Sequence, residues 1–215
     1  MKKSIFAMAI GLMAIVGCSA PQSAPEQSAE NDKNEVIETI MTRRSIRAYK
    51  NQAVPKELLD QVVECGIWAP NAINAQQWEV RVVTSEEWIN SATAAAKEAA
   101  KGTPQEAQFN EPTFKNLFRN APAVIFIGHK PGAYTPVDCG LMAGNMMLAA
   151  KSLGLGTVCM ASPVRTFLLT PAGASFLESL GFSEGYEPLI CIGIGYPDEE
   201  PAAKPRNKEV IKYVE

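Results

Sequence analysis

The sequence predicts an α+β fold, because helical and strand patterns follow one another without the regular alternation of a doubly wound sheet. Two apolar runs rich in β-branched residues, Pro122–Gly128 and Glu187–Gly195, predict buried strands. A third run, Val137–Leu153, is rich in Gly, Ala, Met and Leu on nearly all sides. Such a pattern predicts a long helix in the core or at a subunit interface.

The N-terminus has the features of an exported precursor. A short cationic start, Met1–Lys3, precedes an apolar run, Ile5–Val16, that is too short to span a bilayer. The run ends at a Gly-Cys pair that resembles a bacterial lipobox. We therefore expect residues 1–17 to be a lipoprotein signal peptide and Cys18 to be lipidated, which makes the protein an exported, membrane-anchored lipoprotein facing the periplasm or cell exterior. A soluble secreted protein that is cut elsewhere is the alternative.

Residues 18–34 and the rest of the chain differ sharply in composition. Residues 18–34 are mostly Ser, Ala, Pro, Gln and Glu with no large apolar side chain, which predicts a flexible tether. Residues 35–215 have a length that suits a single domain with a sizeable core. The formal net charge of −3 argues against a nucleic-acid partner.

The remaining elements are predicted by helical spacing, strand alternation and capping residues. Pro begins one helix and Ala69-Pro70 ends it, while Ser85 followed by two Glu caps the start of another. The expected helices are Glu35–Met41, Pro55–Trp68, Ser85–Lys101, Pro163–Leu169 and Thr170–Leu180; the expected strands are Trp78–Thr84 and Thr157–Met160; residues 102–113 are expected to be loop.

Metal and nucleophile chemistry find little support in the sequence. Cys65, Cys139, Cys159 and Cys191 each lie among apolar residues, which favours small buried side chains over metal ligands or disulfides. The single histidine, His129, excludes a multi-histidine metal cluster. A Cys–His nucleophile pair and disulfide pairing both remain open at this point.

Three segments carry residues suited to binding an anionic heterocycle. Arg43–Arg47 holds three guanidinium groups and a hydroxyl within five residues, which form either an anion receptor or a solvated basic surface. Ala69–Trp78 is rich in Asn and Gln, whose amides match a ring edge of alternating donors and acceptors. Gly193–Pro197 precedes Lys204 and Arg206, a basic pair that could close over the same anion.

In this order the segments resemble the FMN-dependent nitroreductase family over about residues 35–215. The resemblance is carried by residues in five motifs: Arg43, Ser45 and Arg47; Pro70, Asn74, Gln76 and Trp78; Asp138, Gly140 and Asn145; Gly154, Leu155 and Gly156; and Gly193, Gly195 and Pro197 with the basic pair. It implies a nitroreductase-like fold with a central mixed or antiparallel sheet flanked by helices, and a homodimer with the long helix at its interface. One FMN would be held at each end of that interface.

The resemblance also implies a role for each site residue. Arg43, Arg44 and Ser45, with Lys204 and Arg206, would bind the ribityl phosphate, and Arg47 and Asn74 would face the pyrimidine side of the ring. A fixed cation at Arg47 would favour reduction, since reduced flavin gathers negative charge near N1 and O2. The remaining cofactor-binding residues are Pro70, Asn71 and Gln76 of the amide-rich loop, and Cys159, Met160, Ala161 and Ser162 along the ring. Cys159 and Ala161 depart from the Trp, or Pro followed by Glu-Gly, of many relatives.

The expected activity is ping-pong hydride transfer through flavin N5 between a small-molecule electron donor and an acceptor. No catalytic side chain is required, because the cofactor carries the chemistry. Phe109 and Phe114 are either substrate-stacking groups or packing residues. Export fits poorly with NADH or NADPH as donor, so two alternatives stand beside a nitroreductase-like enzyme. One is a reductive dehalogenase-like member of the family, and the other is a non-catalytic, flavin-holding or partner-binding lipoprotein.

Overall fold

The structure of the chain is a computed structural model that describes residues 34–215. The expected signal peptide, the lipidation site Cys18 and all of the expected tether except Asn34 lie outside the described residues. Asn34 caps the first helix, α1 (Glu35–Thr42), because its Oδ1 accepts a hydrogen bond from the backbone N–H of Ile37 at 3.1 Å. Within the described part of the chain, no helix has the length and hydropathy needed to cross a membrane.

A four-stranded sheet lies at the centre of these residues. Its strands are β1 (Trp78–Val83), β2 (Ala123–His129), β3 (Gly156–Met160) and β4 (Glu187–Gly195). They lie in the order β1-β2-β4-β3, and every pair of neighbouring strands is antiparallel. An isolated parallel bridge joins Ser45 to Thr157 beside the edge strand β3. The sheet is therefore antiparallel rather than mixed, and the α+β prediction is confirmed.

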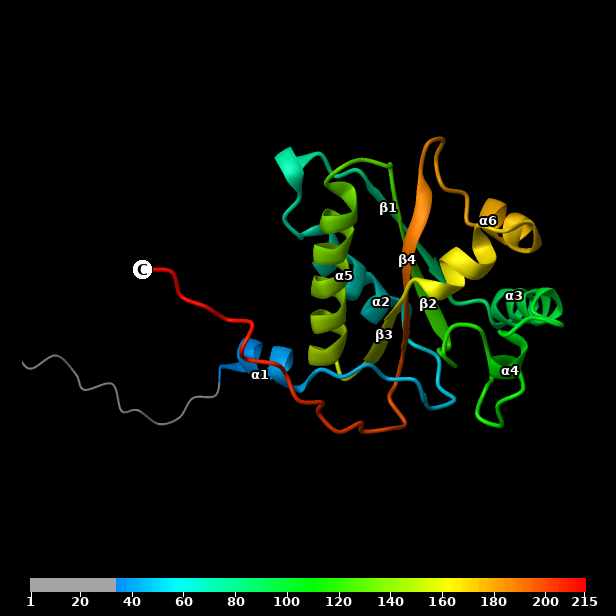
Figure 1. Cartoon of the computed structure of the whole chain (residues 1–215), viewed down its shortest axis with the longest axis horizontal. Coiled ribbons are helices and arrows are strands. Elements are labelled where there is room, and N and C mark those ends of the chain that lie inside the picture. The colour runs from blue at the N-terminus through cyan, green and yellow to red at the C-terminus, as the bar shows by residue number, and fades with distance from the viewer. Residues whose placement is uncertain (1–33) are drawn as a thin grey trace, which may run out of the picture. The chain divides into compact units, whose positions relative to one another are not determined.

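Helices cover both faces of the sheet, as Figure 1 shows. Helices α2 (Lys56–Ile67) and α5 (Thr135–Ser152) lie on one face and pack on Ile125, Ile127 and other side chains of that face. On the other face, α3 (Glu86–Ala99) packs on Val124 and Phe126. Alternate residues of β2 thus enter different cores, which is why the whole strand is buried.

The helical predictions hold to within a few residues, with one correction. The expected loop at 102–113 contains a short helix, α4 (Glu106–Phe109), and Phe109 is buried with its ring 5.0 Å from that of Phe114. Both rings pack in the core on the α3 face, which favours the packing interpretation over substrate stacking. The segment before β4 consists of the short turns η2 (Val164–Leu168) and η3 (Pro171–Gly173) and the helix α6 (Ala174–Ser179).

The Gly-Leu-Gly segment ends α5 and directs the chain into β3. Gly154 has a φ of +77°, a left-handed conformation that glycine adopts readily. The N–H of Leu155 donates to the carbonyl of Ala150 at 2.8 Å, and that of Gly154 donates to the carbonyl of Lys151 at 3.1 Å. This is a Schellman motif, and it sets where β3 begins relative to α5.

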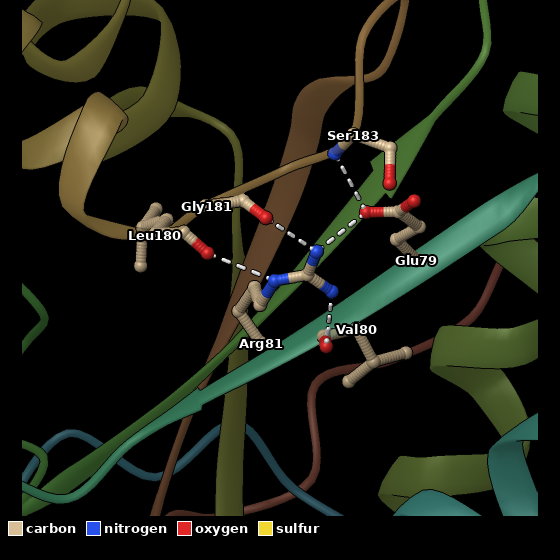
Figure 2. A network of polar contacts seen from close by, with 6 residues as sticks. All are labelled: Glu79, Val80, Arg81, Leu180, Gly181 and Ser183. Atoms are coloured by element: carbon tan, nitrogen blue, oxygen red, sulfur yellow. Dashed lines mark hydrogen bonds and ion pairs between the residues drawn. The ribbon is translucent and has the colours of Figure 1, made fainter.

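A polar network fastens the loop between α6 and β4 to the edge strand β1 (Figure 2). The Arg81 guanidinium donates to the carbonyls of Leu180 at 2.8 Å and Gly181 at 2.7 Å, and pairs with Glu79 at 2.6 Å. Glu79 also accepts from the N–H of Ser183 at 3.1 Å. Desolvation pushes the pKa of Glu79 upward, but the bonds from Ser183 and the charge of Arg81 outweigh it and lower the pKa.

Candidate functional site

The segment after α1 runs between β3 and the chain that leaves β4. The N–H of Ile46 donates to the carbonyl of Thr157 at 2.9 Å, next to the parallel bridge at Ser45. Farther on, the N–H of Lys50 donates to the carbonyl of Tyr196, and the N–H of Asp198 donates to the carbonyl of Ala48, both at 2.9 Å. These bonds bring residues 43–50 and 196–199, which are far apart in the sequence, side by side.

Two glycines of the sequence motifs leave room for this segment to dock. A Cβ on Gly156 would lie 2.7 Å from Cγ1 of Ile46, and one on Gly195 would lie 2.8 Å from Cδ1 of Tyr49. Ile46 and Tyr49 are both buried, and the Tyr49 hydroxyl donates to the carbonyl of Ile46 at 2.7 Å. Burial raises the pKa of Tyr49, and the Glu199 carboxylate adds to the rise while Arg47 opposes it, so this residue stays a neutral phenol.

Six of the predicted phosphate and ring residues surround one cavity of about 180 Å³, which we call the basic cavity. It is lined by Arg43, Arg44, Ser45, Arg47, Pro201, Ala202, Lys204 and Arg206. None of these described residues is acidic, and in the described part of the chain none of the five cations forms an ion pair with a carboxylate. Five positive charges around one space repel each other and favour an anion there.

The arginines are not equivalent. Nη1 of Arg44 donates to the carbonyls of Met41 and Arg43, both at 2.8 Å, so this side chain also caps the end of α1. Nη1 of Arg47 donates to the carbonyl of Ser45 at 3.2 Å, and the side chain of Arg47 is exposed. The Arg44 guanidinium thus bonds to the end of α1 as well as lining the basic cavity, whereas the Arg47 side chain is exposed to solvent.

The Arg47 backbone is held from two sides by Glu199 and Asn120, residues that no sequence motif singles out. Its N–H donates to Oε1 of Glu199, and its carbonyl accepts from Nδ2 of Asn120 at 3.2 Å. Nδ2 of Asn120 also donates to the carbonyl of Thr113 at 3.0 Å, and its Oδ1 accepts from the N–H of Lys115 at 2.7 Å. The acidic turn before Lys204 and the Asn residues after Phe114 are weak signals in the sequence, since neither belongs to a recognisable motif.

The end of β3 lies beside the basic cavity. Ser45, which lines this cavity, pairs with Thr157 of β3. Burial raises the pKa of the Cys159 thiol, and the charge of Arg43 opposes that rise. Cys159, Ala161 and Ser162 are exposed, whereas the Met160 side chain is buried in the core on the α3 face. The Met160 side chain is therefore not available to a ligand.

The amide-rich loop lies at the other end of α5. The N–H of Ala72 donates to Oδ1 of the buried Asp138 at 3.1 Å, in the first turns of that helix. Arg43 and Lys151, near the last turn, line a common cavity. At about 1.5 Å of rise per residue, the helical stretch from Asp138 to Lys151 is roughly 20 Å long. Figure 1 shows this separation between α1 and the turn η1 (Ala72–Asn74).

The same loop is strained. Ile73, Asn74 and Gln76 have φ angles of 50°, 53° and 48°, in the left-handed region that non-glycine residues rarely occupy. Ile73 is β-branched and 97% exposed, so packing does not account for its conformation. A bond from the N–H of Gln76 to Oδ1 of Asn71, at 2.9 Å, holds the turn closed. Held strain of this kind is typical of ligand-binding segments.

One chain thus assembles part of the predicted site. Folding brings together Arg43, Arg44, Ser45, Arg47, Lys204 and Arg206, with Cys159 beside them. It leaves Pro70, Asn71, Asn74 and Gln76 at the opposite end of α5, where Pro70, Asn74 and Gln76 are exposed.

Among the described residues, the cysteines and the histidine do not form a second catalytic or metal site. Cys139 and Cys191 are buried as expected, but Cys65 and Cys159 are exposed, which corrects the expectation that all four are buried; all four are free thiols. The buried His129 contacts Oγ1 of Thr135 at 2.9 Å rather than a cysteine. Within residues 34–215, no group of three or more His, Cys, Asp or Glu side chains gathers where it could hold a metal ion.

Comparisons with known proteins identify the family to which this chain is similar. The model of the nitroreductase family matches residues 40–196. An FMN reductase [NAD(P)H] of Bacillus subtilis is 31% identical over 187 residues, covering 80% of this chain and 70% of that protein. The crystal structure of a nitroreductase with bound FMN from Desulfitobacterium hafniense matches with a TM-score of 0.75 and 31% identity, covering 85% of this chain and 99% of that one.

A relative from the dehalogenating branch is also similar. An iodotyrosine deiodinase of Thermotoga neapolitana is 24% identical over 185 residues, covering 80% of this chain and 93% of that protein. The family model spans most of the chain, and the fold matches that of a solved nitroreductase along nearly its whole length. The chain therefore belongs to the nitroreductase family and is an FMN-dependent oxidoreductase.

Proposed function

We propose that this protein is a homodimeric flavoenzyme that transfers hydride through N5 of FMN in a ping-pong sequence, with donor and acceptor binding in turn at one face of the ring. The observation that carries the proposal is the basic cavity, where five cations without a carboxylate partner in the described chain lie beside the exposed end of β3. This arrangement fits a ligand with an anionic phosphate at one end and a flat ring at the other.

The phosphate would be bound by groups of different geometry. Arg43 offers a planar fork of donors suited to two phosphate oxygens, and the Ser45 hydroxyl adds a further donor. Lys204 and Arg206 close the cavity from the C-terminal segment. Because hydrogen bonds between charged groups are the strongest available here, these residues would supply most of the affinity at this end.

The ring would lie along residues 159–162, with Arg47 at its pyrimidine side. When bound, FMN supplies the hydride chemistry, so the chain's own residues orient the ring and set the potential around it. The Arg47 guanidinium is exposed, and its backbone is fixed by Glu199 and Asn120. A cation held in this way stabilises the extra negative charge of a reduced ring without having to move.

A second copy of the chain would complete the site. A stripe along α5, composed of Val137, Gly140, Leu141, Gly144 and Leu148, is apolar or small and is exposed or half-buried. Two subunits that met on this stripe would bring the amide loop of one toward the basic cavity of the other. The strained, outward-facing conformation of that loop supports a ligand or partner at this position.

The expected lipid anchor at Cys18 remains part of the proposal. An exported enzyme would meet little free NADH or NADPH, so its donor is a separate question from its cofactor. The similarity to an iodotyrosine deiodinase favours a dehalogenating activity as the second candidate function. A flavin-holding protein without turnover is the third.

The first experiment is an absorbance spectrum of the purified domain from residue 35 onward, followed by anaerobic addition of NADH or NADPH. We expect a flavin spectrum. Bleaching by the nucleotide would support a nitroreductase-like cycle, whereas a bound flavin that stays oxidised would direct the search to other donors and to halogenated phenols as acceptors. If the domain binds no flavin even after addition of FMN, the proposed function is wrong.

A further inference from the structure

The carboxylate of Glu199 is bound where a negative charge is unexpected. Its Oε1 accepts hydrogen bonds from the backbone N–H groups of Arg47 and, at 3.1 Å, Ala48. With Arg43, Arg44 and Lys151 it also lines a cavity of about 430 Å³ that shares both arginines with the basic cavity. Judged by charge alone, a carboxylate here weakens the attraction of these arginines for a phosphate.

The position of Glu199 in the chain suggests what this carboxylate does. The backbone bonds that tie the C-terminal segment to residues 43–50 end at Asp198. Between Glu200 and Arg206, the described structure has no hydrogen bond back to that segment. Glu199 is therefore the last residue before Lys204 and Arg206 that is hydrogen-bonded to residues 43–50. Lys204 and Arg206 must lie close to Arg43 for the basic cavity to exist.

Glu199 also acts on Arg47. Its bonds hold the N–H side of the Arg47 peptide, while Asn120 holds the carbonyl side. Nη1 of the exposed Arg47 side chain also donates to the carbonyl of Ser45 at 3.2 Å, so both the backbone and the guanidinium of Arg47 make hydrogen bonds within the chain. The Glu199 carboxylate thus links the C-terminal basic pair, which would bind the phosphate, to Arg47, which would face the ring.

We propose that Glu199 is a positioning residue, which seats the C-terminal basic pair against Arg43 and orients Arg47, and that this function outweighs its unfavourable charge. The inference rests on the proposed binding of FMN. It assigns Glu199 no contact with the flavin, since both of its bonds go to the backbone of this chain.

Three variants separate position from charge. Glu199→Ala removes the acceptor and the charge, while Glu199→Gln removes the charge but keeps an oxygen able to accept both N–H bonds. Glu200→Ala is the matched control, because Glu200 lines the same cavity and carries the same charge. If charge alone mattered, all three changes would tighten binding of the FMN phosphate.

The measurement is the dissociation constant of FMN for the apoprotein, followed by quenching of flavin fluorescence. We expect Glu199→Ala to weaken binding about ten-fold or more, a size typical of coupled polar contacts. Glu199→Gln should stay within about three-fold of the unchanged protein, and Glu200→Ala should bind as tightly or more tightly. If Glu199→Ala binds FMN as well as Glu200→Ala does, the inference is wrong.

Two further readouts exclude a merely structural effect. In a Lys204→Ala/Arg206→Ala background, Glu199→Ala should cost at most about three-fold, because the groups that it seats are gone. Amide exchange in the folded apoprotein should speed up at Arg47 and Ala48 in Glu199→Ala but not in Glu199→Gln. An equal loss of affinity in both backgrounds would overturn the seating role. Absence of FMN binding by the unchanged protein would instead refute the proposed function.

Discussion

The two ends of helix α5 differ in how much of a binding site one chain completes. At the C-terminal end, segments from both ends of the domain are joined by backbone hydrogen bonds, and they surround the basic cavity. At the N-terminal end, the amide loop is held by Asp138 and by its own Asn71, and it presents Ile73 to solvent in a strained conformation. The first end resembles a finished anion site, and the second resembles a surface that meets something outside this chain.

This contrast shows that residues predicted to bind one ligand can lie at separate places in a single folded chain. The basic residues gather because backbone hydrogen bonds join their segments, and because Gly156 and Gly195 leave room for Ile46 and Tyr49 to pack closely. The amides of the loop stay apart from them because a rigid helix lies between. A homodimer would bring the two kinds of residue together, one from each subunit.

The largest effect is expected at the basic cavity, which a single chain assembles. Changing Arg43 and Arg206 to Ala together should weaken FMN binding by about a hundred-fold or more, since each charge-assisted bond contributes roughly 1.5–3 kcal/mol. The measurement is FMN occupancy and the dissociation constant after purification. A Lys56→Ala/Lys101→Ala variant removes the same charge from two surface ion pairs and serves as the control. Unchanged occupancy in the arginine variant would remove the phosphate assignment.

For the amide loop at the N-terminal end of α5, the prediction concerns formation of the dimer. Leu141→Glu places a charge in the exposed stripe of α5, so the protein should elute as a monomer and bind FMN about ten-fold or more weakly, because a buried unpaired charge destabilises an interface. The measurement is light scattering coupled to gel filtration. Leu169→Glu is matched, since Leu141 is 44% and Leu169 46% exposed, and Leu169 follows η2 rather than lying on α5. A Leu141→Glu dimer with full affinity would refute the proposed interface.

A smaller change is expected in the reduction potential of the bound flavin. Arg47→Ala should leave FMN bound but lower its reduction potential, because a fixed cation near the pyrimidine side is lost. A ten-fold preference corresponds to about 30 mV for a two-electron couple, and we expect a shift of roughly that size in an anaerobic redox titration. Arg165→Ala, which removes an exposed arginine on η2, is the control. A potential equal to that of the unchanged protein would reject this role for Arg47.

The smallest effect tests the strain itself. Ile73→Asn should raise the free energy of unfolding by about 1 kcal/mol, since Asn tolerates a left-handed backbone and the exposed side chain of Ile73 packs little. Thermal or urea unfolding of the apoprotein measures the change. Ile40→Asn alters an exposed Ile in regular helix and should be neutral or destabilising. If the two variants behave alike, the loop stores no strain.

Much of the fold could be predicted from the sequence because its signals are local. The strand Glu187–Gly195 has the predicted bounds, and Ser85 caps α3 as expected, with its Oγ accepting from the N–H of Trp88. The missed helix α4 is only four residues long and lies in a polar stretch, where periodicity has too little length to emerge. The exposure of Cys159 was missed because alternation in a strand shows that faces differ, but not whether an edge strand is covered.

The sequence by itself determined the order of elements, the basic and amide-rich character of the three binding segments and the family they resemble. Local spacing, capping and side-chain chemistry are sufficient for these. Only the tertiary structure decided which segments meet: it joined Arg43 to Arg206 across the ends of the domain, placed Glu199 under the Arg47 backbone and held the amide loop at the far end of α5. The physical reason is that such contacts depend on hydrogen bonds and packing between residues far apart in the sequence, from 66 positions for Ala72 and Asp138 to 152 positions for Arg47 and Glu199, which no local pattern encodes.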